Sequence, residues 1–597
     1  MIKKLAQYLG SYKKYVWMAP LLVLLDVVAE LSMPLLMSKI VDTGIPSADT
    51  AYIVRIGTYM VLLALAAIAL GVTNMKVTSL AGQGLGANLR EALFKKVQSF
   101  SFSNIDRFSA GSLVTRLTND VNNIQNTVIM GIRLLLRSPM MLIVALFLAF
   151  RINAQLSLIL AIAIPLLTLA IILIMGRAVR LYEKMQTKID GLNNTIQENL
   201  VGIRVVKSFV RQDYEKKKFK KSNDDLTAAA INALNLALLG MPVMMFVVNG
   251  ATLAIIWFGG GMVSTGQMGT GELISFISYV MQILISVMML SMVILMIARA
   301  EASGQRIMEV LEAEVDITDP VPAKAVSGSM QSPASDQELL TPAHLVHRGK
   351  VEFRDVSFKY SVSGSGENVL SGINFVAEPG EVVGIVGGTG TGKTTLVNLI
   401  PRLYDVTEGA VMVDDVDVRE YRLEDLRKGI GVVLQQNTLF SGTIRENLLW
   451  GNENATQEEL EKVCKDAQAH DFIMSFPDGY DTVLGQAGVN ISGGQKQRLY
   501  IARAMLKKPK ILILDDSTSA VDSGTEAKIR ESFNRNLKDT TVFIIAQRIS
   551  SVSQADKIIV IDDGKIVGLG SHQELLAKNT IYKEINFSQQ EGVLGNA

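Results

Sequence analysis

The feature that most constrains this chain is a glycine-rich stretch between two apolar segments. It reads Gly387, Gly388, Thr389, Gly390, Thr391, Gly392, Lys393, Thr394 and Thr395. Because it follows residues 382–386 and precedes residues 396–400, both rich in Val, Leu and Ile, we expect a strand, a loop and a helix. The spacing of its glycines, lysine and threonine is that of a phosphate-binding loop. The stretch therefore predicts a nucleoside triphosphate site.

In such a loop, backbone N–H groups surround the phosphate oxygens, and the N-terminus of the following helix adds partial positive charge. We expect Lys393 to reach the β- and γ-phosphates and the Thr394 hydroxyl to bind Mg²⁺. A second apolar run, residues 511–514, ends in Asp515. A carboxylate at the end of a strand downstream of a phosphate-binding loop is expected beside the same Mg²⁺, bound to it through water.

Long apolar segments fill the first half of the chain. With 597 residues, 49% of them hydrophobic, the chain is too long for a single core. Most of the apolar excess lies before about residue 300, in segments long enough to cross a bilayer as helices. We expect six spans, at about 16–40, 54–74, 128–150, 156–175, 233–258 and 273–298. The chain is therefore predicted to be a multi-pass integral membrane protein surrounded by the lipid bilayer.

The charges between the spans predict an orientation. Residues 42–53 and 259–271 lack Lys and Arg, whereas 76–127 and 176–227 are rich in both. Because basic loops stay inside, we expect the two long segments and both termini to be cytoplasmic. Their helical pattern predicts helices that continue well past the bilayer, with tips near 104–108 and 208–213. Residues 1–15 are predicted to form an amphipathic helix on the membrane surface.

The composition changes after the last span. Residues 313–349 carry four prolines among Ser, Gly and Ala, which is typical of a linker. From residue 350 onward, strands rich in Val and Ile alternate with helical patterns. We therefore expect a transmembrane domain at 1–312 and an α/β nucleotide-binding domain at 350–597. The net charge of +1 argues against a nucleic-acid partner, and the single cysteine excludes an intrachain disulfide.

Further motifs in the second domain give the sequence a family resemblance. The stretch 491–498, which contains Ser492, Gly493, Gly494 and Gln495, resembles the ABC signature. Gln435 resembles the glutamine of the Q-loop, Tyr360 resembles the aromatic residue that stacks on adenine, and Asp522 ends a stretch, 519–522, that resembles the D-loop. With six spans before these motifs, the chain is similar to one half of an ABC exporter over nearly its whole length.

This resemblance implies an all-α transmembrane domain of six long helices, like that of type IV exporters, followed by an ABC-type P-loop NTPase domain. It implies ATP and Mg²⁺ as cofactors, with Thr394, Gln435 and Asp515 at the metal. In that family two half-transporters pair head to tail, and each ATP lies between the P-loop of one half and the signature of the other. The implied location is a bacterial cytoplasmic membrane.

Two positions of the ATP site depart from the family pattern, and a third departure is Gln486, where exporters usually have a glutamate near the coupling helices. Where the family has the glutamate that orients the attacking water, this chain has Asp516, whose carboxylate is withdrawn by roughly 1.5 Å. Where the family has a switch histidine, it has Gln547, whose neutral amide carries no positive charge. Both changes fall in one site, so we expect a degenerate site and a heterodimer in which a partner half supplies hydrolysis. A homodimer with Asp516 as a working base is the alternative.

Two acids in the first span bear on the substrate. Asp26 and Glu30 lie one helical turn apart, and intramembrane carboxylates are costly and often functional. They are candidates for the path of a cationic or amphipathic substrate, and pairing with Arg133 or Arg137 of the third span is the structural alternative. Methionines crowd the last two spans, which favours a small amphipathic substrate, as in multidrug exporters; ordinary packing of the helices is the alternative for these methionines.

Other functions stay open at this point. A lipid or peptide exporter would have the same transmembrane and nucleotide-binding domains. A soluble ABC ATPase of the DNA-repair kind conflicts with the six predicted spans. A regulatory or channel-like subunit would bind ATP without pumping, and flux against a gradient would exclude it.

Overall fold

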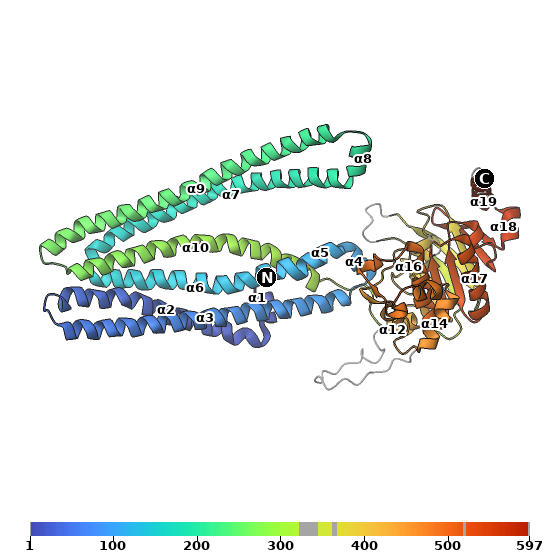
Figure 1. Cartoon of the computed structure of the whole chain (residues 1–597), viewed down its shortest axis with the longest axis horizontal. Helices are drawn as coiled ribbons and strands as arrows, with labels where there is room; N and C mark the ends of the chain where they lie inside the picture. Colours follow the sequence, from blue (N-terminus) through green and yellow to red (C-terminus); the bar gives the residue numbers. More distant parts are fainter. Residues whose placement is uncertain (1, 321–343, 361–366, 518–520, 595–597) are drawn as a thin grey trace. The chain divides into compact units, whose positions relative to one another are not determined.

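The structure is a computed structural model that describes residues 2–320, 344–360, 367–517 and 521–594 (Figure 1). Residues 321–343 of the predicted linker, and Ser519 and Ala520 of the predicted D-loop, lie outside the described residues. The chain divides into two compact units. The first consists of Met1–Gln98 and Ala110–Ala313, and the second of Ser99–Ser109 and Glu314–Ala597.

The first unit is built of long helices. The described residues contain six helices long and apolar enough to cross a membrane, which confirms the six-helix prediction. Their main segments are α2 (Lys13–Lys39), α3 (Thr50–Gln98), α6 (Val121–Ile152), α7 (Ala154–Val201), α9 (Gln212–Ser264) and α10 (Thr270–Leu311). The helix α5 (Ala110–Thr115) precedes α6. Since α3, α7 and α9 have 49, 48 and 53 residues, each is more than twice the ~20 residues that a span needs.

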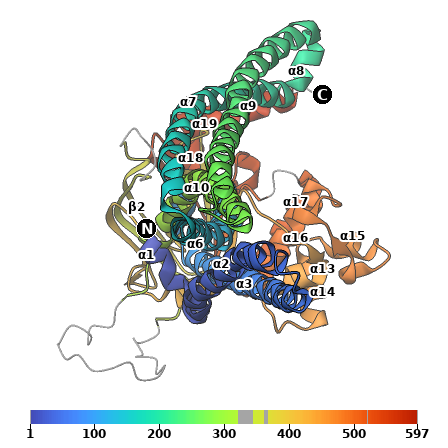
Figure 2. The same ribbon diagram turned by 90° about the vertical axis from the view of Figure 1, so that its left-hand side faces the viewer.

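The long helices lie in pairs. Figures 1 and 2 show α7 and α9 side by side, joined by the short α8 (Ile203–Ser208) near the predicted tip at 208–213. At the other end of the unit, the Asp42 carboxylate accepts hydrogen bonds from the N–H groups of Gly271 at 2.6 Å and Glu272 at 2.9 Å. These bonds satisfy free donors at the start of α10 and place its start beside the chain that follows α2.

The prediction of one amphipathic helix over residues 1–15 is wrong. The chain forms α1 (Ile2–Leu5) and a 3₁₀ segment (Ala6–Tyr12) before α2 begins. Gly10 breaks the helical path with φ of 50° and ψ of −126°. The Asn88 side chain donates to the Tyr8 carbonyl at 2.7 Å, and a Cβ on Gly10 would lie 3.3 Å from that same amide. A contact 80 residues away thus fixes the bend, which local periodicity cannot reveal.

The second unit contains two main sheets. An antiparallel sheet has the order β2-β1-β4-β5, formed by β1 (Val351–Phe358), β2 (Leu370–Ala377), β4 (Glu408–Val413) and β5 (Val416–Asp417). A larger sheet has the order β12-β11-β3-β10-β9-β6, formed by β3 (Val382–Gly387), β6 (Ile430–Val433), β9 (Ile511–Asp515), β10 (Thr541–Ile545), β11 (Lys557–Asp562) and β12 (Lys565–Gly570). All its neighbours are parallel except β11 and β12. A short pair, β7 (Gly442–Thr443) and β8 (Val483–Leu484), completes the strands of the described residues.

Helices cover these sheets, as expected for an α/β domain. They are α11 (Lys393–Leu399), α12 (Leu423–Lys428), α13 (Ile444–Leu449), α14 (Gln457–Asp466), α15 (His470–Met474), α16 (Gly493–Leu506), α17 (Ser523–Asn536), α18 (His572–Lys578) and α19 (Thr580–Leu594). Every residue of β9 is buried, because a parallel strand covered on both faces meets no solvent. The α/β fold predicted for this half of the chain is confirmed.

The tip predicted at 104–108 forms α4 (Phe102–Phe108), which belongs to the second unit. The Asn104 side chain donates to the Glu314 carbonyl at 2.9 Å. The Tyr404 hydroxyl donates to the Asp106 carboxylate at 2.7 Å. These bonds attach α4 to Glu314, ahead of β1, and to Tyr404 in the segment that follows α11.

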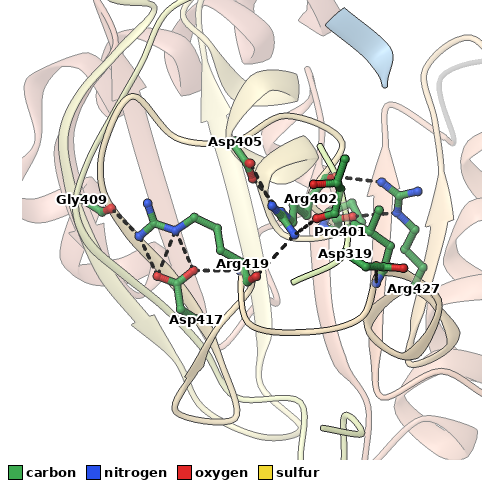
Figure 3. Close-up of polar contacts among 10 residues, drawn as sticks. Asp319, Pro401, Arg402, Asp405, Gly409, Asp417, Arg419 and Arg427 are labelled. Carbon is green, nitrogen blue, oxygen red and sulfur yellow. Dashed lines mark hydrogen bonds and ion pairs between the residues drawn. The ribbon is translucent and has the colours of Figure 1, made fainter. Parts of the chain in front are cut away.

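A buried arginine anchors that same segment (Figure 3). The Arg402 side chain is 7% exposed, and its Nε lies 2.8 Å from Oδ1 of Asp405. It also donates to the carbonyls of Thr318 at 3.3 Å and Arg419 at 3.5 Å, while Arg427 donates to the carbonyl of Arg402 at 2.8 Å. Arg402 thereby connects the chain that enters the second unit, at Thr318, to the segment just after α11, the helix that follows the glycine loop.

We predict that Arg402→Met lowers the free energy of unfolding of the second unit by about 2 kcal/mol. Removing one partner of a fully buried ion pair costs about 3–5 kcal/mol, and Asp405 is partly solvated, which reduces the loss. Arg419→Met is the matched control, because the Arg419 side chain is 43% exposed in its pair with Asp417. That variant should lose less than about 1 kcal/mol. Urea unfolding of the full chain measures both, and equal losses would contradict the role given to Arg402.

Candidate nucleotide-binding site

The glycine loop between β3 and α11 has room for nothing larger than glycine at two positions. A Cβ on Gly387 would lie 2.1 Å from the carbonyl oxygen of Ile561. Gly392 has φ of +94°, and a Cβ there would lie 2.8 Å from Leu370 Cδ2. Because side chains are excluded, the backbone N–H groups are open to a phosphate. The strand, loop and helix lie in the order that the sequence predicts.

Lys393 is the first residue of α11, and its ammonium group lies over the loop. Its Nζ donates to the carbonyls of Gly387 at 3.1 Å and Gly388 at 2.5 Å. Burial lowers the pKa of Lys393, while the carboxylates of Asp515 and Asp516 oppose that shift. The ammonium group is thus held where it can pair with a phosphate of a bound nucleotide.

Thr394 and Asp515 meet beside the lysine. The Thr394 hydroxyl donates to Oδ1 of Asp515 at 3.1 Å. Asp515 is 1% exposed, and within the described residues its other oxygen, Oδ2, has no hydrogen-bond partner. Among the described residues, no group of three or more His, Cys, Asp or Glu side chains is arranged to hold a metal ion. Mg²⁺ suits such a site, because it takes one or two carboxylates and completes its shell with water and nucleotide phosphates.

The buried aspartate predicts a pH dependence in Mg²⁺-free buffer. Burial raises the pKa of Asp515, and the Thr394 hydroxyl opposes this. Protonation of Asp515 therefore stabilises the folded protein. This stabilisation is complete below the ordinary pKa of aspartate and is lost as the pH rises through the raised pKa of Asp515 in the folded state. We expect the melting temperature of the wild type to fall relative to Asp515→Asn over that range. Mg²⁺ with ADP should stabilise the wild type and not the variant. Melting temperatures of the wild type and Asp515→Asn that change with pH by the same amount would contradict this prediction.

The remaining predicted residues follow the carboxyl ends of parallel strands. Gln435 comes two residues after β6, whose Val433 pairs with Leu514 of β9. Gln547 comes two residues after β10, whose Ile545 pairs with Asp515. Because β3, β6, β9 and β10 are parallel, their carboxyl ends share one edge, where α/β sheets bind ligands. The sheet therefore brings the chain positions of these residues to the edge at which β3 leads into the glycine loop.

Asp516 and Gln547, the two departures from the family pattern at the ATP site, are bonded to each other. Nε2 of Gln547 donates to Oδ2 of Asp516 at 2.9 Å. Asp516 has φ of +49°, a conformation that aspartate tolerates better than most residues. Burial raises the pKa of Asp516, and the bond from Gln547 opposes that rise. The family resemblance predicts both residues at the γ-phosphate end, but the sequence does not show that they pair.

The signature residues lie at the start of another helix. Ser492 caps α16, its Oγ accepting from the N–H of Gln495 at 3.3 Å, while Oε1 of Gln495 accepts from the N–H of Ser492 at 2.8 Å. A helix start of this kind suits an anion. Among the described residues, no hydrogen bond joins positions 492–495 to positions 387–395. Asp522 caps α17, where the N–H of Thr525 bonds to it and lowers its pKa.

Tyr360 lies against the P-loop helix, within an aromatic cluster. Its hydroxyl is 2.9 Å from the Thr395 hydroxyl, and its ring meets Tyr404 edge to face at 5.2 Å. Burial raises the pKa of both tyrosines. Through its bond to Asp106, Tyr404 connects the proposed adenine-stacking residue to α4. Sequence reasoning missed Tyr404, because no spacing along the chain links it to Tyr360 or to α4.

In the transmembrane unit the predicted acids are paired. Arg137 donates to Asp26 at 2.9 Å and also bonds to Glu30, so the structural alternative named for these acids is present. Arg133, the other arginine considered, bonds to neither acid in the described part of the chain.

Comparisons with known proteins agree with this architecture. Sequence profiles described as "ABC transporter transmembrane region" and "ABC transporter" match residues 16–288 and 370–519. The chain is 38% identical over 588 residues to the uncharacterized ABC transporter ATP-binding protein YfiB of Bacillus subtilis, covering 98% of each chain. It is 36% identical over 509 residues to the ATP-dependent lipid A-core flippase of Syntrophus aciditrophicus, covering 85% of this chain and 81% of the relative.

A solved structure shares the whole fold. The structure of a bacterial Atm1-family ABC exporter with ATP bound matches with a TM-score of 0.76 and 25% identity, covering 97% of this chain and 99% of the other. Together, six membrane-capable helices, a phosphate-binding loop, a paired Thr394 and Asp515 and full-length relatives lead to one assignment. The chain belongs to the ABC transporters and is an exporter half-transporter, in which a transmembrane domain is fused to an ATPase domain that couples ATP hydrolysis to transport.

Proposed function

We propose that this chain is one half of a heterodimeric exporter that moves amphipathic or drug-like compounds out across the membrane by alternating access. Its phosphate-binding loop, together with Thr394 and Asp515, holds ATP and Mg²⁺ in a weakly hydrolysing site. Its signature, Ser492 to Gln495, completes the hydrolytic site of a partner half. In this proposal residues 1–312 and 350–597 are the two domains, both termini are cytoplasmic, and the membrane is a bacterial cytoplasmic one.

The hydrogen bond between Gln547 and Asp516 carries this proposal. A general base must point an oxygen at the attacking water, within about 3 Å of it. Here Oδ2 of Asp516 accepts from the Gln547 amide at 2.9 Å, and the side chain is one methylene shorter than glutamate. Gln547 also places a neutral amide where a cation would stabilise the γ-phosphate. Binding groups are kept while hydrolytic groups are weakened, which a transporter tolerates when its partner supplies hydrolysis.

A homodimer is the second candidate, and one observation favours it. Burial raises the pKa of Asp516, and a base whose pKa is closer to neutral accepts a proton more readily. In that case Asp516 would be the working base in two equal sites. The hydrogen bond that the Gln547 amide donates to Asp516 opposes this rise in pKa, so we place the heterodimer first.

The substrate class rests on the chemistry of the transmembrane unit. Its helices present an ion-pair cluster around Arg137 beside methionines, which adapt to varied apolar groups. The relative from Syntrophus aciditrophicus is a lipid flippase by name, which supports a lipid-like amphiphile over a peptide.

Composition and flux of the native complex test the proposal. We would tag the chain in its native membrane and extract the complex in polymer nanodiscs. Native mass spectrometry would then measure the mass of the complex. A second, different half-transporter in the particle is expected, together with ATP-driven uptake of a fluorescent amphiphile into inverted vesicles. A particle of two identical chains would refute the heterodimer. ATP binding without flux against a gradient would refute export.

A further inference from the structure

We propose that a polar pocket in the transmembrane unit binds the zwitterionic headgroup of a lipid-like amphiphile, one that carries both a protonated amine and a phosphate or carboxylate. The inference rests on the proposed export function and names the chemistry of its substrate. It depends on three features of the pocket: the balance of its charges, two buried polar atoms without partners, and an apolar lining.

The pocket lies among α2, α6 and α10 and has a volume of about 430 Å³. Its polar lining comprises Glu30 from α2, Arg133, Arg137 and Ser138 from α6, and Gln282 and Ser286 from α10. A cavity of this size suits a headgroup with the first part of an acyl chain. Polar groups from three different membrane helices therefore meet at one cavity.

The charges of the pocket are separated into two centres. Arg137 bonds to both Asp26 and Glu30, so this triad carries one more negative than positive charge when its members are ionised. Arg133 lies one helical turn before Arg137, is exposed, and has no hydrogen bond or ion pair with the described residues. The pocket thus offers one surplus negative charge at the triad and one surplus positive charge at Arg133. A ligand with a single charge satisfies only one centre and is repelled by the other.

Two buried polar atoms lack partners at the same cavity. Ser138 is 3% exposed, and within the described residues neither its Oγ nor the buried Oε1 of Gln282 has a hydrogen-bond partner. A buried polar atom without a partner costs about 1–3 kcal/mol. Oε1 of an amide can only accept, so it calls for a ligand that donates. A protonated amine has N–H donors for Gln282 and positive charge for the triad, while the anionic group of the same ligand pairs with Arg133.

The rest of the lining is apolar and adaptable. Met130, Leu134 and Met141 of α6 and Ile285 and Met289 of α10 line the same cavity. Methionine and leucine side chains accommodate acyl chains of different shape. The sequence makes Asp26 and Glu30 candidates for the path of a cationic or amphipathic substrate, with pairing to Arg133 or Arg137 as the alternative. The pairing with Arg137 and the unpaired Arg133 change that expectation to a zwitterion.

Binding to the purified full-length chain tests this inference by native mass spectrometry in detergent. The probes are lysophosphatidylethanolamine, which has both charges and N–H donors, and lysophosphatidylcholine, which has both charges without N–H donors. Lysophosphatidylglycerol and an alkyltrimethylammonium carry one charge each, and a hydrophobic dipeptide has both charges without an acyl chain. We expect lysophosphatidylethanolamine to bind at least about tenfold more tightly than each of the others.

Two variants separate the charge centres. Arg133→Gln should weaken lysophosphatidylethanolamine about tenfold and strengthen the alkyltrimethylammonium, because the negative triad is then unopposed. Gln282→Leu should remove the preference for lysophosphatidylethanolamine over lysophosphatidylcholine. Arg151→Gln is the matched control, because Arg151 lies in the last turn of α6 and does not line the pocket, so the binding of neither ligand should change.

Arg133→Gln is expected to bind the alkyltrimethylammonium more tightly than the wild type does. A misfolded variant would instead bind every probe more weakly, so the two outcomes can be distinguished. Equal binding of all five probes, tightest binding of a singly charged probe or of the dipeptide, or an Arg133→Gln variant that binds like the wild type would overturn the inference. ATP-driven flux in vesicles would still stand in those cases. Loss of flux for every amphiphile would refute the proposed function instead.

Discussion

The double variant Asp516→Glu with Gln547→His should raise ATP turnover by the chain alone about 100-fold. Glutamate extends the carboxylate by one methylene toward the attacking water, and histidine replaces the amide that now bonds to Asp516. A well-placed general base contributes about 10²–10⁴-fold, and we take the lower end because the introduced glutamate must adopt the positive φ of +49° that Asp516 has now. Steady-state phosphate release from the chain in lipid nanodiscs measures the change.

The matched control is Asp516→Gln with Gln547→His, which has the size of the active pair without the carboxylate. It should show no gain, and both double variants should bind ATP as the wild type does. If the wild type already turns over as fast as the variant with glutamate and histidine, the aspartate is a competent base and the degenerate-site proposal fails.

Gly493→Asp should reduce turnover by the heterodimer about 10²–10³-fold while leaving ATP binding to the chain's own P-loop unchanged. Gly493 is the first residue of α16, where helix N–H groups suit a phosphate. A carboxylate there repels the γ-phosphate of the nucleotide held by the partner and so weakens the N–H contacts to the transition state, and losing one such contact in a preorganised site has effects of this size. The variant should fold, because acidic residues in the first turn favour a helix.

Gly493→Asn controls for shape, since it has nearly the same size without the charge. It should retain several times more activity than Gly493→Asp in the co-purified heterodimer. Equal activity of wild type and Gly493→Asp would mean that this signature does not serve a hydrolytic site.

The architecture could be predicted from the sequence because the patterns that encode it are local. Apolar segments of about 20 residues predict membrane helices whatever their neighbours are, and residues 387–395 carry a complete loop pattern. The strand, loop and helix around Lys393, the fully buried strand that ends in Asp515 and the six long helices all follow from such patterns. The locations of Gln435 and Gln547 beside the loop follow from parallel strand pairing.

The missed features are contacts between residues far apart in the chain. The bend at Gly10 depends on Asn88, and the bond from Tyr404 to Asp106 spans 298 positions. The choice of Arg137 over Arg133 as partner of the two acids was also open, because both arginines lie on one face of the third span. Tertiary packing decides such pairings, and periodicity along one helix does not encode them.

In the proposed function, this chain binds ATP in its own site but hardly hydrolyses it. The most direct test is ATP turnover of the chain purified alone in lipid nanodiscs, measured beside ATP binding and beside Asp516→Asn. We predict stoichiometric binding and turnover well below about 1 per second, the lower end for typical enzymes, with activity restored by a different half-transporter. Turnover of several per second by the lone chain, abolished by Asp516→Asn, would contradict the claim and make the protein a homodimer with aspartate as its base.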